Sequence, residues 1–253
     1  KWDATVQKPV LDPVVASKPQ AILIAANDKT VMQKPIEAAI AAGIKVVLVD
    51  TTIDDPSSAV SEIASDNYGG GKAAFDAVKQ LQPKGGKVLV VSTSPGVSSV
   101  DARVLGFADK ANADKKFNYI GVQYSNNEPA VAQRIVTAAL AKNRDIVAVF
   151  ATNLFSAQGV AAGIKQAGRA GKVTVVGFDA GSDQVKALKA GTVQALIAQQ
   201  PGTIGSKGIE AAVAAIAGKA PESKKIATGF TILTKKNIDT AAGKKAQYRD
   251  SCN

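Results

Sequence analysis

The feature that most constrains the fold is a recurring alternation of short, Val- and Ile-rich apolar runs with longer amphipathic stretches. A polar turn follows each run, and this succession predicts β-α-β units. Most runs are continuously apolar, so we expect an α/β fold in which buried, mainly parallel strands carry helices on both faces. The expected strands are Ala21–Ala26, Lys45–Asp50, Lys87–Ser92, Asn118–Gln123, Ile146–Ala151, Val173–Asp179, Val193–Ala198 and Phe230–Leu233.

Helices are expected between these strands, and glycine ends several of them, as in Ala42-Gly43, where it supplies a left-handed cap. The first helix contains Pro9 and Pro13, which predict a kink. It also precedes every strand, which is unusual for a doubly wound sheet. The expected helices include Thr5–Ser17, Thr30–Ala42, Gly70–Leu81, Pro129–Lys142, Ser156–Gly168 and Gly205–Ala217.

The composition argues against an enzyme. The chain has no histidine, which removes the usual general base and the commonest metal ligand, and its single cysteine, Cys252, forms no CxxC motif. The segment Tyr68–Lys72 resembles a phosphate loop, but Asp66 occupies the first glycine position and Ala73 the Ser/Thr position. We therefore expect a non-enzymatic protein with no catalytic residues, no cofactor and no metal.

The formal charge of +10 raises the question of a nucleic-acid partner. The lysines are scattered through predicted helices and turns, with only short runs such as Lys224-Lys225 and Lys235-Lys236, and this pattern favours a solvated surface and no nucleic acid. No apolar stretch approaches the ~20 residues that span a bilayer. No signal peptide is recognisable, which fits either a cytoplasmic protein or a mature exported one.

Polar residues follow the predicted strands, where ligands bind to open parallel sheets. Their carboxylates, amides and hydroxyls could pair with the donors and acceptors of a polyol. Helix N-capping is the alternative role, and it applies best to Asn27, Asp28 and Ser94. Asp50 and Asp179 directly end buried strands, where an unpaired carboxylate is costly. The strand endings are Asn27-Asp28, Asp50-Thr51, Ser92–Ser94, Tyr124–Asn127, Thr152-Asn153, Asp179 and Gln199.

Three motifs occur in a characteristic order: Ile63–Asn67 before a glycine-rich helix start, Val175–Asp179, and Ala195–Pro201. In that order and spacing they resemble the periplasmic sugar-binding proteins of the ribose-binding type, which are type I periplasmic binding proteins and substrate-binding components of ABC transporters. The opening Trp2–Pro9 and the ending Thr228–Asn237 are also similar to segments of that family. The resemblance covers nearly the whole chain.

The resemblance implies two doubly wound parallel-sheet lobes joined by a three-strand hinge. The first lobe would comprise residues 1–65 plus 199–253 and the second residues 66–198, with crossings near Ser65–Asn67, Gln199–Pro201 and Thr228-Gly229. Family members begin with a β-α-β unit that this sequence does not contain. We therefore expect the true start of the protein to lie upstream of Lys1, where a cysteine would be a disulfide partner for Cys252.

The resemblance also assigns roles to residues. Asp50 matches a first-lobe aspartate that accepts hydrogen bonds from sugar hydroxyls, and Arg103 matches a second-lobe arginine whose planar fork grips two oxygens. Thr51 stands where the family often has arginine. The remaining ligand-binding candidates are Asn153, Asp179 and Gln199 as polar contacts, Asn27 in compensation for Ala25 at a family asparagine position, and Phe155 and Tyr124 as aromatic stackers.

The function implied is capture of a monosaccharide or sugar alcohol, with closure by hinge motion and recognition by a membrane permease. We expect a monomer in the periplasm or another extracytoplasmic space, either free or anchored as a lipoprotein. The alternative is the effector-binding domain of a lactose-repressor-type transcription regulator, which shares the fold but would bind DNA. A third and less favoured hypothesis is an enzyme with this fold.

Overall fold

The computed structural model describes residues 3–249, which leaves Cys252 and its expected disulfide outside the described residues. The described chain divides into two compact units. Unit 1 contains the residues up to Asp66, the short segment Gly96–Asp101, and Gln200–Gly229. Unit 2 contains Asn67–Pro95, Ala102–Gln199 and the described residues from Phe230 onward.

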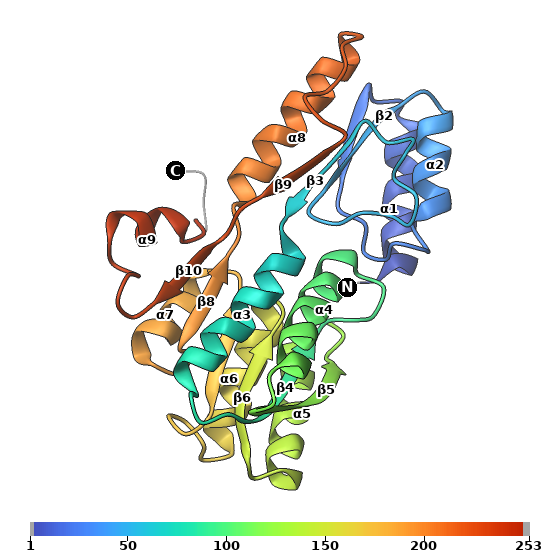
Figure 1. Ribbon diagram of the computed structural model, residues 1–253. Helices are drawn as coiled ribbons and strands as arrows, with labels where there is room; N and C mark the ends of the chain where they lie inside the picture. The colour runs from blue at the N-terminus through green and yellow to red at the C-terminus, as the bar shows by residue number, and fades with distance from the viewer. Residues whose placement is uncertain (1–2, 250–253) are drawn as a thin grey trace. The chain divides into compact units, whose positions relative to one another are not determined.

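Unit 1 is built on a four-stranded, all-parallel sheet in the order β1-β2-β3-β9. The helices α1 and α2 lie on one side of this sheet and α8 on the other (Figure 1). In β2, Val46 and Leu48 pack with residues of α1 and α2, whereas Val47 packs on the other face with residues of α8. This alternation is what a strand covered on both sides requires. The elements are α1 (Ala4–Ala16), β1 (Ala21–Ile24), α2 (Gln33–Ala41), β2 (Lys45–Val49), β3 (Ser61–Ser65), α8 (Pro201–Ile216) and β9 (Lys225–Thr228).

Unit 2 is built on a six-stranded sheet in the order β10-β8-β7-β6-β4-β5, parallel except for the antiparallel pair β10 and β8. Leu89 and Val91 of β4 pack against α5, α6 and α7, whereas Val88 and Val90 pack against α3 and α4. The elements are α3 (Asn67–Leu81), β4 (Gly86–Ser92), α4 (Ser98–Ala113), β5 (Phe117–Tyr124), α5 (Pro129–Lys142), β6 (Ile146–Ala151), α6 (Leu154–Gln166), β7 (Thr174–Phe178), α7 (Ser182–Ala190), β8 (Ala195–Ala198), β10 (Thr231–Thr234) and α9 (Ala241–Ala246). The first turn of α4, up to Asp101, belongs to unit 1.

The predicted α/β class with mainly parallel, doubly covered sheets is confirmed, and a strand lies at every predicted position. Two strands, β3 and β9, were not predicted, because both are short and mix polar with apolar residues. The crossings expected at Ser65–Asn67 and near Thr228-Gly229 include only the last residue of each strand. The helices α4, α7 and α9 were not among those predicted. Polar first turns, such as Ser98–Asp101 of α4, conceal the apolar periodicity that would reveal a helix.

The C-terminal segment differs from the expected lobe boundaries. The family resemblance implied that residues 199–253 belong to the first lobe, but β10 pairs with β8 and extends the sheet of unit 2. Leu233 and Ile238 lie in the same core cluster as Leu196 of β8. The physical reason is that β10 covers the edge of β8, which would otherwise expose a row of unpaired backbone groups.

The strand β1 is at one end of its sheet, and among residues 3–249 no strand pairs with its outer edge. On α1, the side chains of Val6, Val10 and Val14 are exposed at helical spacing.

Candidate functional site

Each unit carries one aspartate with the same unusual backbone. Asp50 follows β2 with a φ of 65°, and Asp179 follows β7 with a φ of 79°. The backbone N–H of Asp50 donates to the Ile63 carbonyl and that of Asp179 to the Ile197 carbonyl, both at 2.9 Å, and each acceptor lies on the neighbouring parallel strand. A left-handed backbone conformation at a non-glycine residue costs roughly 1–2 kcal/mol, and residues with this conformation are enriched at functional sites. These two aspartates are therefore the starting points for the site.

The Asp179 carboxylate is the centre of a hydrogen-bond network in unit 2. Its Oδ2 accepts the backbone N–H of Leu154 at 2.9 Å, and its Oδ1 accepts Nε2 of Gln199 at 2.7 Å. The side chain is buried, with 8% of the residue exposed. Because a buried carboxylate must be hydrogen-bonded, these donors fix its orientation.

Arg103 is buried beside this network, with 2% of the residue exposed. Its Nε donates to Oδ1 of Asn67 at 2.8 Å, and its Nη1 donates to the carbonyl of Thr152 at 2.9 Å. The guanidinium carbon lies 3.6 Å from the ring centroid of Phe178, which is a cation–π contact. Since Phe178 and Thr152 directly precede Asp179 and Asn153, Arg103 lies beside two other predicted site residues.

Asn153 is the N-cap of α6, where its Oδ1 accepts the N–H of Ser156 at 3.1 Å, and its Nδ2 donates to Oδ1 of Asn127 at 2.6 Å. The capping role weighed from the sequence therefore applies to this residue. The buried hydroxyls of Ser125 and Ser156, 3.2 Å apart, join the end of β5 to the start of α6. They follow Tyr124 and Phe155, two exposed aromatic side chains on the same unit.

Asn27 and Asp50 lie at the carboxyl ends of the neighbouring strands β1 and β2 in unit 1. The N–H of Asn27 donates to Oε1 of Gln7 at 2.8 Å. Asp28 stabilises the turn before α2, because its Oδ1 accepts the N–H groups of Thr30 and Val31. The N-cap of α2 itself is Met32, so Asp28 is not the helix cap that the sequence favoured. The structure thus gathers Arg103, Asn153, Asp179 and Gln199 in unit 2, and separately places Asn27 and Asp50 at one edge of unit 1.

Tyr248 is a network member that the sequence reasoning missed. Its hydroxyl donates to Oδ1 of Asp179 at 3.0 Å and accepts the N–H of Gln199 at 3.0 Å. Burial, and then the negative charge of Asp179, raises the pKa of the Tyr248 hydroxyl, so the phenol keeps the proton that it donates. No local signal marks this residue, because it follows α9 in a segment expected in the other lobe.

We expect Tyr248→Phe to lower the free energy of unfolding by about 1–2 kcal/mol, because it leaves buried hydrogen-bond partners unsatisfied. The matched control is Tyr68→Phe, whose lost hydroxyl donates to Oδ2 of Asp109 on the exposed surface; its expected cost is below about 0.5 kcal/mol. Urea denaturation measures both. Equal effects of the two substitutions would contradict the buried network.

Thr51 is buried, with 2% exposed, and its Oγ1 has no hydrogen-bond partner among the described residues. Thr152 is equally buried, but its hydroxyl donates to Oγ of Ser92 at 2.9 Å. We therefore expect Thr51→Val to leave the free energy of unfolding unchanged or raise it by up to about 1 kcal/mol, and Thr152→Val to lower it by about 1–2 kcal/mol. Chemical denaturation without ligand tests the contrast, and a larger loss at Thr51 would contradict it.

Within residues 3–249, no cluster of His, Cys, Asp and Glu side chains is arranged to hold a metal ion. In the same part of the chain, no helix has both the length and the apolar character needed to cross a membrane.

A family model described as a periplasmic binding protein domain matches residues 1–220. Among curated proteins, the ribose import binding protein of Salmonella typhimurium (strain LT2) is 34% identical over 203 residues, which cover 80% of this chain and 68% of that protein. The ribose import binding protein of Bacillus subtilis (strain 168) is 30% identical over 217 residues, which cover 86% of this chain and 70% of that protein.

Solved structures are similar over nearly the whole chain. An ABC transporter solute binding protein from Agrobacterium vitis bound with alpha-D-tagatopyranose superposes with a TM-score of 0.92 at 37% identity, covering 96% of this chain and 84% of that one. A second protein from the same organism, with bound D-fucose, gives a TM-score of 0.92 at 32% identity and covers 97% of this chain and 85% of that one.

Proposed function

This chain belongs to the periplasmic binding protein family, and on that premise we propose that it captures a monosaccharide or sugar alcohol for an ABC transporter. The relatives named for ribose, allose and apiose, and the structures with bound sugars, support this function. They favour a function in sugar transport over the alternative hypothesis of a transcription repressor domain.

The observation that carries the proposal is the pair of left-handed aspartates at strand ends, Asp50 in unit 1 and Asp179 in unit 2. A carboxylate held in place by backbone and side-chain donors accepts hydrogen bonds from sugar hydroxyls, and an arginine such as Arg103 donates to sugar oxygens. The exposed rings of Tyr124 and Phe155 offer apolar faces for the C–H side of a sugar. In this proposal, Asn27, Asn153 and Gln199 supply the remaining polar contacts.

We further propose that the ligand contacts both units and that they close on it by hinge motion, as the family resemblance implies. The ligand leaves chemically unchanged, because a binding protein performs no turnover. A membrane permease recognises the liganded form, and the protein acts as a monomer in an extracytoplasmic space, free or lipid-anchored.

Calorimetric titration of the full-length protein tests this function. The panel contains ribose, allose, tagatose, fucose, arabinose and linear sugar alcohols. We expect one-to-one binding of at least one member, unchanged sugar by chromatography after incubation, and a monomer by sedimentation. Absence of binding to every sugar in the panel would contradict the proposal. A new product would instead support the hypothesis that the protein is an enzyme. Dimerisation with salt-sensitive DNA binding would favour the repressor.

A further inference from the structure

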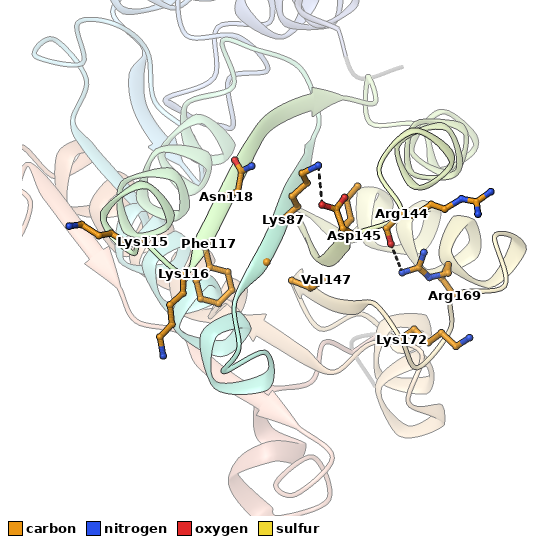
Figure 2. A pocket seen from close by; sticks show the side chains of 12 residues that line it. Lys87, Lys115, Lys116, Phe117, Asn118, Arg144, Asp145, Val147, Arg169 and Lys172 are labelled. Atoms are coloured by element: carbon orange, nitrogen blue, oxygen red, sulfur yellow. Dashed lines mark hydrogen bonds and ion pairs between the residues drawn. The ribbon is translucent and has the colours of Figure 1, made fainter.

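Unit 2 has a hollow of about 560 Å³ where the strands β4, β5 and β6 begin (Figure 2). We call it the basic hollow. Its lining residues are Gly86, Lys87, Lys115, Lys116, Phe117, Asn118, Arg144, Asp145, Ile146, Val147, Arg169 and Lys172.

The basic hollow concentrates positive charge. Six of its twelve lining residues are lysine or arginine and one is acidic, whereas lysine and arginine make up 31 of the 253 residues in the chain. The lining therefore carries a formal charge of +5, half of the +10 of the whole sequence. The sequence reasoning described the lysines as scattered, because these six residues come from separate segments that only the fold brings together.

Most of these cations form no ion pair within the described part of the chain. The single lining acid, Asp145, pairs with Nζ of Lys87 at 3.0 Å, and the guanidinium of Arg169 donates to the backbone carbonyl of Arg144 at 3.0 Å (Figure 2). Among the described residues, no ion pair engages Lys115, Lys116, Arg144 or Lys172. Asp114 forms its ion pair with Lys79 at 2.8 Å, and it also attracts Lys116 electrostatically without forming an ion pair with it. Repulsion among neighbouring cations is costly, and a bound anion relieves it.

The basic hollow is distinct from the sugar-binding candidates. Asn153 follows the carboxyl end of β6, whereas Ile146 of the hollow begins the same strand. Strands of this length separate their two ends by roughly 20 Å. A ligand in the hollow therefore makes no contact with Asp179 or Arg103.

The residues that line the basic hollow indicate which class of ligand it could bind. Phe117 is only 8% exposed, so the hollow has no aromatic face on which a nucleic-acid base could stack. Figure 2 shows Lys115 and Lys116 on one side of Phe117 and Val147, and Arg144, Arg169 and Lys172 on the other. Arginine and lysine together are the usual ligands of phosphate oxygens. We propose that the basic hollow binds a compact polyanion that carries clustered phosphate groups.

Titration with tripolyphosphate tests this site in the full-length protein. We expect saturable one-to-one binding in low salt that weakens steeply as salt is added. The double substitution Lys115→Gln/Lys116→Gln is expected to weaken it about tenfold, because it removes two of the six cations. The matched control is Lys244→Gln/Lys245→Gln, an adjacent and equally exposed pair on α9 outside the hollow, with an expected change below about twofold. Sugar affinity is expected to stay unchanged in both variants.

Three outcomes overturn the proposal. The first is absence of tripolyphosphate binding in low salt by a protein that still binds sugar. The second is equal weakening by the two double substitutions, which would indicate a response to net charge alone. The third is binding to vesicles that contain phosphatidylglycerol without binding to tripolyphosphate, which would indicate a lipid surface. If sugar binding fails while the tripolyphosphate results hold, only the proposed sugar function falls.

Discussion

Replacing Asp179 with alanine is expected to weaken sugar binding about 100-fold or more. Three protein donors leave the carboxylate room to accept one hydrogen bond from a sugar hydroxyl, worth roughly 1.5–3 kcal/mol. The carboxylate also holds Gln199, a second proposed sugar contact, and the two losses together account for this weakening. The substitution also leaves the Leu154 N–H, Gln199 and Tyr248 without their shared acceptor. Calorimetry with the sugar identified in the panel measures the effect.

The matched control for this prediction is Asp183→Ala. Asp183 lies in the first turn of α7 and is exposed, and its one ion pair within residues 3–249 is with Lys186 on the same helix, at 3.0 Å. Sugar affinity is expected to change less than about twofold, because an exposed ion pair contributes little. If circular dichroism shows that the Asp179→Ala variant is folded and its sugar affinity equals that of the wild type, Asp179 does not contact the sugar.

Replacing Gly71 with alanine is expected to lower the free energy of unfolding by about 3 kcal/mol. A Cβ at Gly71 in α3 would clash with the backbone carbonyl of Arg103 in α4, and a backbone atom cannot move aside as a flexible side chain can. In the same way, a Cβ added at Gly106 in α4 would clash with the backbone carbonyl of Tyr68 in α3. Overpacking of this kind forces helices apart. Because it displaces Arg103, the substitution is also expected to weaken sugar binding.

The control is Gly205→Ala in α8, where an added Cβ meets no atom within 4 Å. Alanine favours the helix by up to about 1 kcal/mol over glycine, so the free energy of unfolding is expected to stay the same or rise. Urea denaturation compares the two variants. A Gly71→Ala protein as stable as Gly205→Ala would show that α3 and α4 do not pack this closely.

Apolar runs flanked by turns predicted the strands that are buried on both faces, because such strands need no polar positions. The same rule missed β3, whose residues alternate between buried and half-buried and include serine and glutamate. It also could not place β10, because pairing with β8 depends on contacts between segments far apart in the sequence. Local patterns therefore predicted the sheets, but not which sheet receives the C-terminal strand.

Part of the candidate site could be predicted from the sequence for a related reason. Asp50 and Asp179 stand directly after apolar runs, and the rule that ligands bind beyond strand ends identifies them from sequence. Tyr248 reaches Asp179 across 69 positions, and no periodicity encodes that contact. The basic hollow is similar, because Lys116, Arg144 and Lys172 come together only through the parallel order of their strands.

The most direct test of the proposed function is amide chemical-shift mapping of the full-length protein with the sugar that binds. We predict the largest shifts at and beside Asp50 in unit 1 and at Arg103, Asn153, Asp179 and Gln199 in unit 2, with little change at Lys116 in the basic hollow. Sugar-induced shifts confined to other residues, with those of Asp50 and Asp179 unmoved, would contradict the proposal.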